Sequence, residues 1–436
     1  MIVETPSAVF VEQWTPYYTE GRYFSLTMDT IKQKIDFSEV VSGPNLTDKL
    51  AGVNLTSADL SMSDLDEVNL SGTILRNAYL LCANLKGTNF SHSDLTNANL
   101  SGAIMWFANF DNADLTGADL INASFWSANL QNAKLQGANL WRSEIVDAQL
   151  SEANLTGANL NRANLKNTNL TGANLSHANL NQANLHKANL RGANLSHASL
   201  DKVNLRHSNL ASTKLFHVNL VGSKLDYANL TDANLEGANL EGANLCDVNL
   251  NNAKLIGANL NYVNFRGVKI NDTTELDDKW YLVWDIVNHG AYGQTLTGIN
   301  LENANLKGAN LGVANLTNAN LQGANLRYSN LSDANLSDTN ISDTNLTDIN
   351  LINANLTNAN LHSANLSNTL LFGAQLAKAN LMNANLKNAQ LLGADLTEAN
   401  LEGAELEGAI FGYNLGVSEE MKQELIQRGA IFQDKY

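Results

Sequence analysis

Three histidines, His177, His197 and His217, recur at every twentieth position, and each follows a leucine by two positions. Imidazoles held close together can bind a divalent metal ion or change charge near neutral pH. A solvated polar column copied by duplication is the alternative, because Ser176-His177 and Ser196-His197 repeat one dipeptide. We expect the polar column, and we predict no metal site.

Other residue patterns point away from catalysis. The sequence has no glycine-rich phosphate loop, no HExxH, no GxSxG and no paired-cysteine zinc pattern. Carboxylate pairs such as Asp66-Glu67 occupy outward positions with no apolar pocket that would raise a pKa. We therefore expect a protein that is not an enzyme and that uses no cofactor.

The elements that position these residues are built from a repeat of five. Every fifth residue from Leu50 to Ile270, and again from Leu296 to Phe411, is Leu, Ile, Phe or Met, which makes 69 units. A small residue stands two places before it, and Asn or Asp usually stands one place before it. A period of five fits neither an α-helix nor a flat strand. Stacked coils with inward Leu and Ala, and with an outward ladder of Asn side chains, explain it.

Units such as Ala153-Asn154-Leu155-Thr156-Gly157 resemble the A(D/N)LXX repeats of pentapeptide-repeat proteins. The resemblance implies an all-β solenoid, a right-handed quadrilateral parallel β-helix with one pentapeptide per side and four pentapeptides per coil. It also implies that side chains four pentapeptides apart stack on successive coils. The break between the runs contains Lys279-Trp280-Tyr281-Leu282-Val283-Trp284, which is similar to insertions in cyanobacterial members of the family.

The repeat divides the chain into five parts. These are an N-terminal capping segment (1–45), a first β-helix run (46–270), a helical insertion (271–295), a second run (296–412) and a C-terminal helix cap (413–436). Caps are expected because an open coil presents unpaired strand edges. Homodimerisation through a terminal cap is the competing interpretation.

The insertion predicts a helix that begins at Asp277 or Asp278 and ends at Gly290. Its apolar face would consist of Trp280, Val283, Trp284 and Val287. We expect this face to pack on the solenoid; a partner-binding helix or a hinge is the alternative. The register of five slips by one residue across the break, which permits either one continuous rod or two rods that meet at an elbow near Trp280.

An apolar patch is the first candidate for a binding site. With coils of four pentapeptides, one column and its neighbours gather six apolar residues on the surface: Trp106, Phe107, Ile121, Trp126, Trp141 and Val146. Exposed patches of this kind mark interaction sites, and Trp is enriched at interface hot spots. We expect a partner protein or a second copy there; cover by the N-terminal segment and no role are the alternatives.

A basic belt is the second candidate. Between Ala153 and Leu225 the chain has eight Lys and Arg residues against Asp201 alone, and five of its eight His residues. The remainder of the chain is correspondingly acidic, since the net charge is -16. The belt indicates a surface for an anionic partner, with a solvated polar face as the alternative.

A third feature, the series Asp333, Asp338, Asp343 and Asp348, bears on mimicry of DNA. Residues five apart lie on four sides of one coil, so these carboxylates form a ring and not the acidic column that a DNA mimic requires. The ring therefore disfavours a DNA-mimic protein. A DNA mimic that acts on DNA gyrase or another topoisomerase stays the alternative to a scaffold that binds another protein.

Composition sets the remaining expectations. The acidic balance disfavours direct nucleic-acid binding, and no apolar stretch is long enough to span a membrane. Cys82 and Cys246 provide no disulfide framework. We expect a cytoplasmic protein; the sequence identifies neither the partner nor the pathway.

Overall fold

The computed structural model describes residues 50–433, and its unit is one side of a square coil. In residues 153–157, Ala153 and Leu155 point inward and are fully buried, Asn154 forms a β-bridge, and Thr156 and Gly157 form the turn. The second turn residue has a positive φ, 66° at Gly157. Gly, Asn and Asp tolerate this conformation best, which explains why they are common at this position.

The coils stack through parallel β-bridges between residues four pentapeptides apart, such as Asn154 with Asn174 and Asn159 with Asn179. Bridged residues recur at every fifth position, so four of them fill one coil and each coil has four sides. The inward residues form one continuous core of leucines and small residues, and this core includes a stacked pair of phenylalanine rings, Phe90 and Phe110.

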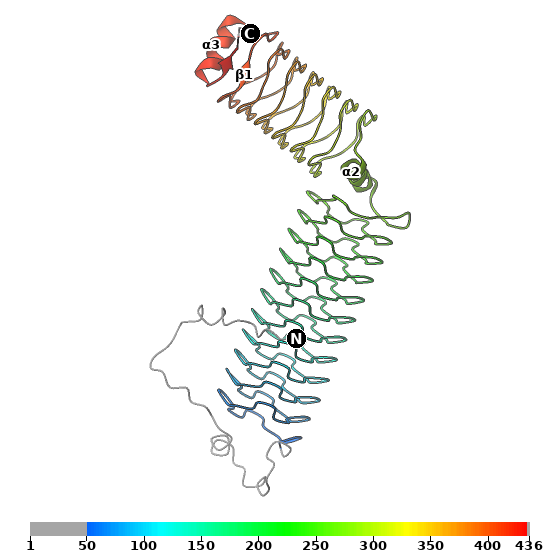
Figure 1. Ribbon diagram of the computed structural model, residues 1–436, viewed down its shortest axis with the longest axis vertical. Helices are drawn as coiled ribbons and strands as arrows, with labels where there is room; N and C mark the ends of the chain where they lie inside the picture. Colours follow the sequence, from blue (N-terminus) through cyan, green and yellow to red (C-terminus); the bar gives the residue numbers. More distant parts are fainter. Residues whose placement is uncertain (1–49, 434–436) are drawn as a thin grey trace, which may run out of the picture.

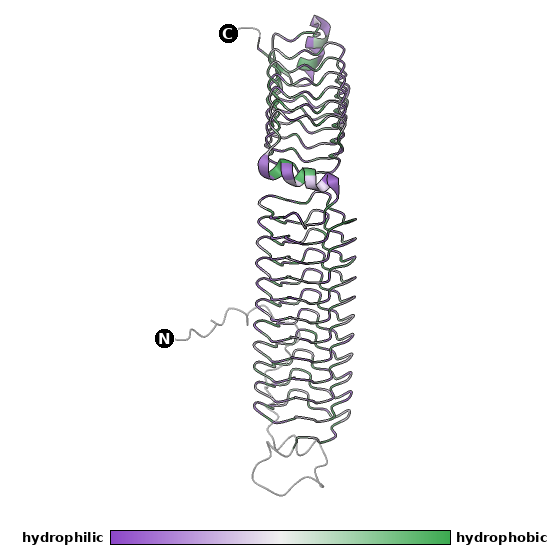
Figure 2. Ribbon diagram, turned by 90° about the vertical axis from the view of Figure 1, so that its right-hand side faces the viewer, coloured by the Kyte–Doolittle hydropathy of each residue, from purple (hydrophilic) through white to green (hydrophobic). Residues whose placement is uncertain are grey.

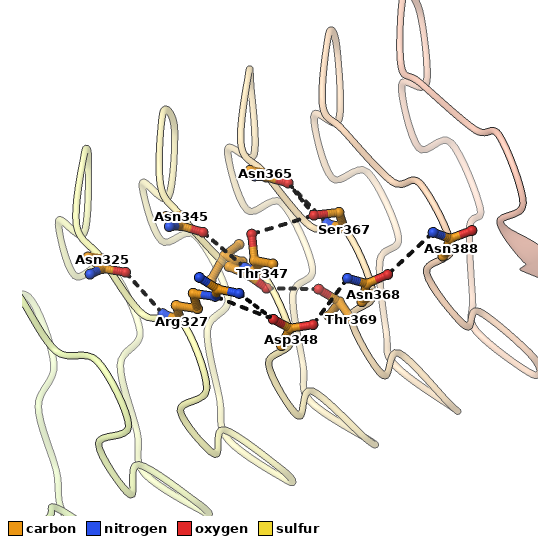
Figure 3. Close-up of polar contacts among 11 residues, drawn as sticks. Asn325, Arg327, Asn345, Thr347, Asp348, Asn365, Ser367, Asn368, Thr369 and Asn388 are labelled. Atoms are coloured by element: carbon orange, nitrogen blue, oxygen red, sulfur yellow. Dashed lines mark hydrogen bonds and ion pairs between the residues drawn. The ribbon is translucent and has the colours of Figure 1, made fainter.

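The predicted ladder of Asn side chains is confirmed. The side-chain amide of Asn129 donates to Oδ1 of Asn109 at 2.9 Å, and that of Asn109 donates to Oδ1 of Asn89 at 3.1 Å. Each Oδ1 also accepts the backbone N–H two residues later, as Figure 3 shows for Asn325 and Asn345 in the second run. The Asn side chain therefore both ties neighbouring coils together and fixes the turn that follows it.

A helix, α2 (Asp278–His289), separates the two runs. The regular unit continues past Ile270 to a bridge at Glu275, and it resumes before Leu296 with the turn at 292–293. The slip of one residue thus lies between Ile270 and Leu276. From Leu276 to Leu296 the numbering stays in the register of five, but α2 itself follows helical spacing: Ile286 is buried, whereas Tyr281 is 53% exposed.

The buried face of α2 differs in part from the predicted one. Trp280, Val283 and Ile286 are buried, whereas Trp284 and Val287 are only partly buried against the core. Asp277 occupies the N-cap but makes no side-chain cap bond. Its carboxylate instead accepts the backbone N–H of Gly257 at 3.2 Å, so it closes the last coil of the first run.

Side chains of α2 terminate the ladder of the first run. Asn288 accepts the backbone N–H of Gly267 at 2.7 Å and donates to the carbonyl of Phe265 at 3.1 Å, while Trp284 Nε1 donates to the carbonyl of Val268 at 2.8 Å. These backbone groups would otherwise pair with a further coil.

The two runs meet at an angle at α2 and do not form one straight rod (Figure 1). In the view turned by 90°, α2 lies across the junction (Figure 2). A direct contact also joins the runs, because Tyr262 donates its backbone N–H to the carbonyl of Asn303 at 2.8 Å and its hydroxyl to Oδ1 of the same residue at 2.7 Å.

The C-terminal end is closed by a helix and a short strand. Strand β1 (Ile410–Phe411) pairs in parallel with β2 (Ile431–Phe432), and α3 (Glu419–Gln427) connects them. Ser418 caps α3 by accepting the N–H of Met421. The segment after α3 is thus a final strand of the ladder, with Ala430 buried but Ile431 exposed. The N-terminal capping segment (1–45) lies outside the described residues.

Candidate protein-binding face

One side of the first run carries the predicted patch. Its bridge residues follow one another through Ile104, Ser124 and Glu144 to Asn164. The turns that flank this column contain Ile121 and Trp141 at one corner, and Trp106, Phe107, Trp126 and Val146 at the other corner. We call this side, from Asn84 to Lys224 along the bridge column, the tryptophan side.

The aromatic residues at one corner form a compact cluster. The rings of Trp106 and Trp126 lie 6.2 Å apart and edge to face, and the ring of Phe107 lies 5.2 Å from Trp126 in the same manner. Indole Nε1 of Trp106 donates to Oγ of Ser124 at 2.7 Å, which fixes the first ring against the next coil. Edge-to-face rings add stability beyond the area that they bury, so this cluster is a preformed surface.

Exposure divides the patch into two kinds of residue. Phe107 is 58% exposed and Trp106 is 37% exposed, whereas Ile121, Trp126, Trp141 and Val146 are half-buried. Phe107 also has a φ of 60°, a conformation that disfavours bulky residues. The turn therefore projects its aromatic ring outward at a cost in backbone energy.

Cations border the apolar residues. The ammonium group of Lys86 lies 4.7 Å from the ring centre of Trp106, and the guanidinium of Arg142 lies 4.3 Å from that of Trp141. Cation–π contacts of this kind stabilise both groups. Glu144, between Trp141 and Val146 along the strand, has a raised pKa because partial burial disfavours its charged form, although the amide of Asn164 opposes this by donating to the carboxylate.

The three spaced histidines stack at a corner away from the tryptophan side. The rings of His177 and His197 lie 5.1 Å apart, and those of His197 and His217 lie 5.4 Å apart, in both pairs nearly parallel. Parallel stacking places the ring nitrogens side by side and does not converge them on one point. Within residues 50–433, no group of three His, Cys, Asp or Glu side chains could hold a metal ion.

Two further histidines lie on the tryptophan side. His186 contacts His207 edge to face at 5.5 Å, and His207 stacks on Tyr227 at 4.9 Å. The pKa of His186 is lowered by partial burial and then by the positive charges of His207, Lys187 and Lys166. Neighbouring positive charges therefore act on His186 in addition to its burial.

The acidic ring of the second run forms no column. Asp333, Asp338, Asp343 and Asp348 each occupy the second turn position of a different side. Asp348 pairs with Arg327 at 3.2 Å and accepts the amide of Asn368 at 3.1 Å (Figure 3). In the described part of the chain no column keeps a carboxylate on more than two successive coils.

A family model for pentapeptide repeats matches this chain in several stretches, which together cover well over half of it. The matched residues are 49–72, 70–106, 108–143, 148–186, 188–226, 213–252, 233–273, 295–333, 334–373 and 374–412. The chain belongs to the pentapeptide repeat family. The sequence-based recognition is therefore confirmed, and the parallel β-helix that this family implies agrees with the bridges described above.

Solved structures of other pentapeptide repeat proteins are similar to this chain. HetL, from the cyanobacterium Nostoc sp. strain PCC 7120 and involved in heterocyst differentiation regulation, is 32% identical over 52% of this chain and 92% of its own (TM-score 0.29). The protein alr5209 of the same organism is 32% identical over 24% of this chain and 84% of its own (TM-score 0.22).

QnrB1, a plasmid-mediated fluoroquinolone resistance protein, is 19% identical over 39% of this chain and 86% of its own, with a TM-score of 0.20. A comparison with curated protein sequences found no match. Because all three TM-scores are low, the family assignment depends on the repeat match and not on these superpositions.

Two parts of the pentapeptide surface were not predicted. Ile104 occupies a bridge position that is usually Asn, and it adds an apolar residue beside Trp106. A second apolar column, Ile352, Phe372 and Leu392, lies half-buried in the other run, with Leu370 in a bridge position. An apolar residue in an Asn position was the signal at Ile104 and Leu370, and the recurrence of apolar residues on successive coils was the signal for Ile352, Phe372 and Leu392.

Proposed function

We propose that this pentapeptide repeat protein is a non-enzymatic, rod-like scaffold that binds another protein through its tryptophan side. The observation that supports this most is the cluster of Trp106, Phe107 and Trp126, which keeps aromatic area at the surface in fixed edge-to-face contacts. Tryptophan clusters with a polar border are typical of interface hot spots. A regulatory role in a cyanobacterium belongs to this proposal, as does a cytoplasmic location.

The test is affinity capture from lysate of the native host with three baits, quantified by mass spectrometry. The baits are the wild type, a Trp106→Ser/Trp126→Ser/Trp141→Ser variant, and a control in which Tyr281, Tyr292 and Tyr413 are replaced by Ser. The control removes three exposed aromatic residues elsewhere. We expect one protein held by the wild type and by the control but lost from the tryptophan variant. Equal capture by all three baits would reject the tryptophan side.

A DNA-mimic protein directed at DNA gyrase is the alternative function. It requires acidic columns along one face, and the observed ring of four carboxylates does not supply one. A supercoiling assay tests it directly: we expect that this protein neither inhibits gyrase nor protects it. Inhibition or protection at stoichiometric protein would favour the alternative.

Neither α2 nor α3, the helices within residues 50–433, has the length and apolar content of a membrane-spanning helix. Homodimerisation through a terminal cap stays a prediction. Sedimentation of the wild type beside an Ile426→Lys/Ile431→Lys variant tests it at the C-terminal cap, where both isoleucines are exposed.

A further inference from the structure

The cations of the basic belt are not distributed evenly around the coil. Six of the eight lie on the tryptophan side, at its two corners or in its bridge column: Arg162, Lys166, Lys187, Lys202, Arg206 and Lys224. The other two, Arg191 and Lys214, belong to the opposite side. We call the first six the cationic strip.

The strip continues the apolar patch along the same corners of the coil. The corner column that holds Trp106, Trp126 and Val146 passes directly to Lys166, His186 and Arg206 on the next coils. The other corner of the tryptophan side, which holds Ile121 and Trp141, passes from Arg142 to Arg162 and Lys202. From Lys86 to Arg206 this surface spans six coil steps, or about 29 Å at roughly 4.8 Å per coil.

Four of the six cations of the strip make no ion pair within residues 50–433, although Glu144 and Asp147 stand on the same side. Arg206 pairs with Asp226 at 3.0 Å, and Lys202 lies 3.8 Å from Asp201. The guanidinium of Arg162 donates to the amide oxygen of Gln182 at 3.1 Å. Among the residues that the structure describes, no ion pair is found for Arg162, Lys166, Lys187 or Lys224.

A positive strip of this kind in a protein of net charge -16 is unusual enough to need a reason. Clustered like charges destabilise the folded chain through their mutual repulsion. At His186, burial and then the charges of His207, Lys187 and Lys166 lower the pKa, so like charges stand close together there. An anionic partner that lies along the strip would remove the repulsion and would be attracted by it.

We propose that the partner of the tryptophan side is an extended acidic protein segment that places an aromatic or aliphatic anchor on Trp106 and Trp126 and carboxylates along the cationic strip. This inference rests on the proposed function, because it specifies the chemistry of the partner at the same side. The length of the surface matches an extended segment of about nine residues at roughly 3.3 Å per residue. A single-stranded nucleic acid is the competing ligand, since it also uses cations with aromatic residues.

Peptide display on the full chain provides the first test. A random peptide library is selected on the wild type, and binders that still bind a Lys166→Glu/Lys187→Glu variant are removed. We expect the remaining peptides to be enriched in Asp and Glu and to contain an aromatic or large aliphatic residue. Remaining peptides without an acidic bias, or no enrichment at all, would overturn the inference.

The selected peptide is then titrated by fluorescence anisotropy against matched variants. We expect affinity to fall about tenfold or more for Lys166→Glu/Lys187→Glu and for Trp106→Ser/Trp126→Ser, and to weaken with salt. The control Arg191→Glu/Lys214→Glu makes the same change in net charge on the opposite side and should change affinity less than about twofold. An equal loss with the control, or tighter binding of an oligothymidylate of equal charge, contradicts an acidic protein segment.

The capture experiment separates failure of this inference from failure of the proposed function. If the patch-dependent protein is still held by the Lys166→Glu/Lys187→Glu bait, the scaffold function stands and the acidic partner is wrong. If no protein depends on the tryptophan residues, both fail. Loss of the same protein from the tryptophan variant and from Lys166→Glu/Lys187→Glu, with retention by Arg191→Glu/Lys214→Glu, supports the scaffold function and the acidic partner together.

Discussion

Some turn residues of this fold are not the types that their backbone conformation favours. The second turn position has a positive φ on every regular side, and Asn, Asp and Gly fill most of these positions. Phe107, Val313 and Tyr227 occupy it against that preference. At Phe107 and Tyr227 the unfavourable residue takes part in an aromatic contact, which suggests that surface chemistry has been kept at the expense of backbone energy.

Val313 gives a direct measure of that expense. It is 45% exposed with a φ of 60°, and a β-branched residue is a genuine outlier there. We expect Val313→Asn to raise the free energy of unfolding by about 0.5–1 kcal/mol, measured by denaturant unfolding. The control Val221→Asn changes a first turn position with an ordinary φ and should not stabilise the protein. A destabilised Val313→Asn variant would show that the valine side chain makes contacts worth more than the strain.

His186 provides a prediction about pH. Partial burial and the charges of His207, Lys187 and Lys166 lower its pKa. Because the folded-state pKa lies below the unfolded value of about 6.5, the stabilisation from neutral His186 is complete above that value and is lost as the pH falls through the folded-state pKa. A proton NMR titration should find this lowered pKa, and Lys187→Gln should raise it. No response to Lys187→Gln would contradict a contribution of the Lys187 charge to the pKa of His186.

At the scale of the element, the coil is stabilised by its inward residues and by its Asn ladder. Leu180 is fully buried, so Leu180→Asp would bury a charge with no partner. We expect a loss of more than about 4 kcal/mol and unfolding of neighbouring coils, seen as hydrogen exchange spreading to both sides. Asn181→Asp, one residue later, keeps the Oδ1 acceptor that binds Ser199 and Asp201 and should change the melting temperature little. Equal melting curves for the two variants would show that the inward assignment is wrong.

Helix α2 is expected to hold the end of the first run. Asn288→Ala would remove both the acceptor for the N–H of Gly267 and the donor to the carbonyl of Phe265. Leaving such backbone groups without partners costs about 1–3 kcal/mol. We therefore expect faster amide exchange at residues 265–268 in this variant. Asn251→Ala, at a turn whose side chain has no such role, is the control, and comparable exchange in both would contradict the capping role of α2.

At the scale of the whole molecule, the repeat made most of the architecture predictable. The positions of Leu155 and Asn154 are each repeated in nearly every unit, so one pattern fixes the core, the ladder and the stacking of residues such as His177 and His197. The junction was less predictable, because it depends on single contacts such as Tyr262 with Asn303, which no periodic signal records. The apolar columns of the first run followed from the spacing, but Ile104 was missed because its position normally holds Asn. The column of Ile352, Phe372 and Leu392 in the second run was missed as well.

Photocrosslinking tests the central claim, that the tryptophan side binds a partner protein, most directly. In the native host, a photoreactive phenylalanine analogue replaces either Ser127 or Ser212. Ser127 lies in the turn next to Trp126, and Ser212 is the equivalent turn residue at a corner of the opposite side. Both serines have the same backbone conformation, with φ values of 53° and 57°. We predict that one protein is crosslinked from position 127 and not from position 212. The same crosslinks from both positions, or crosslinks from position 212 alone, would contradict the claim.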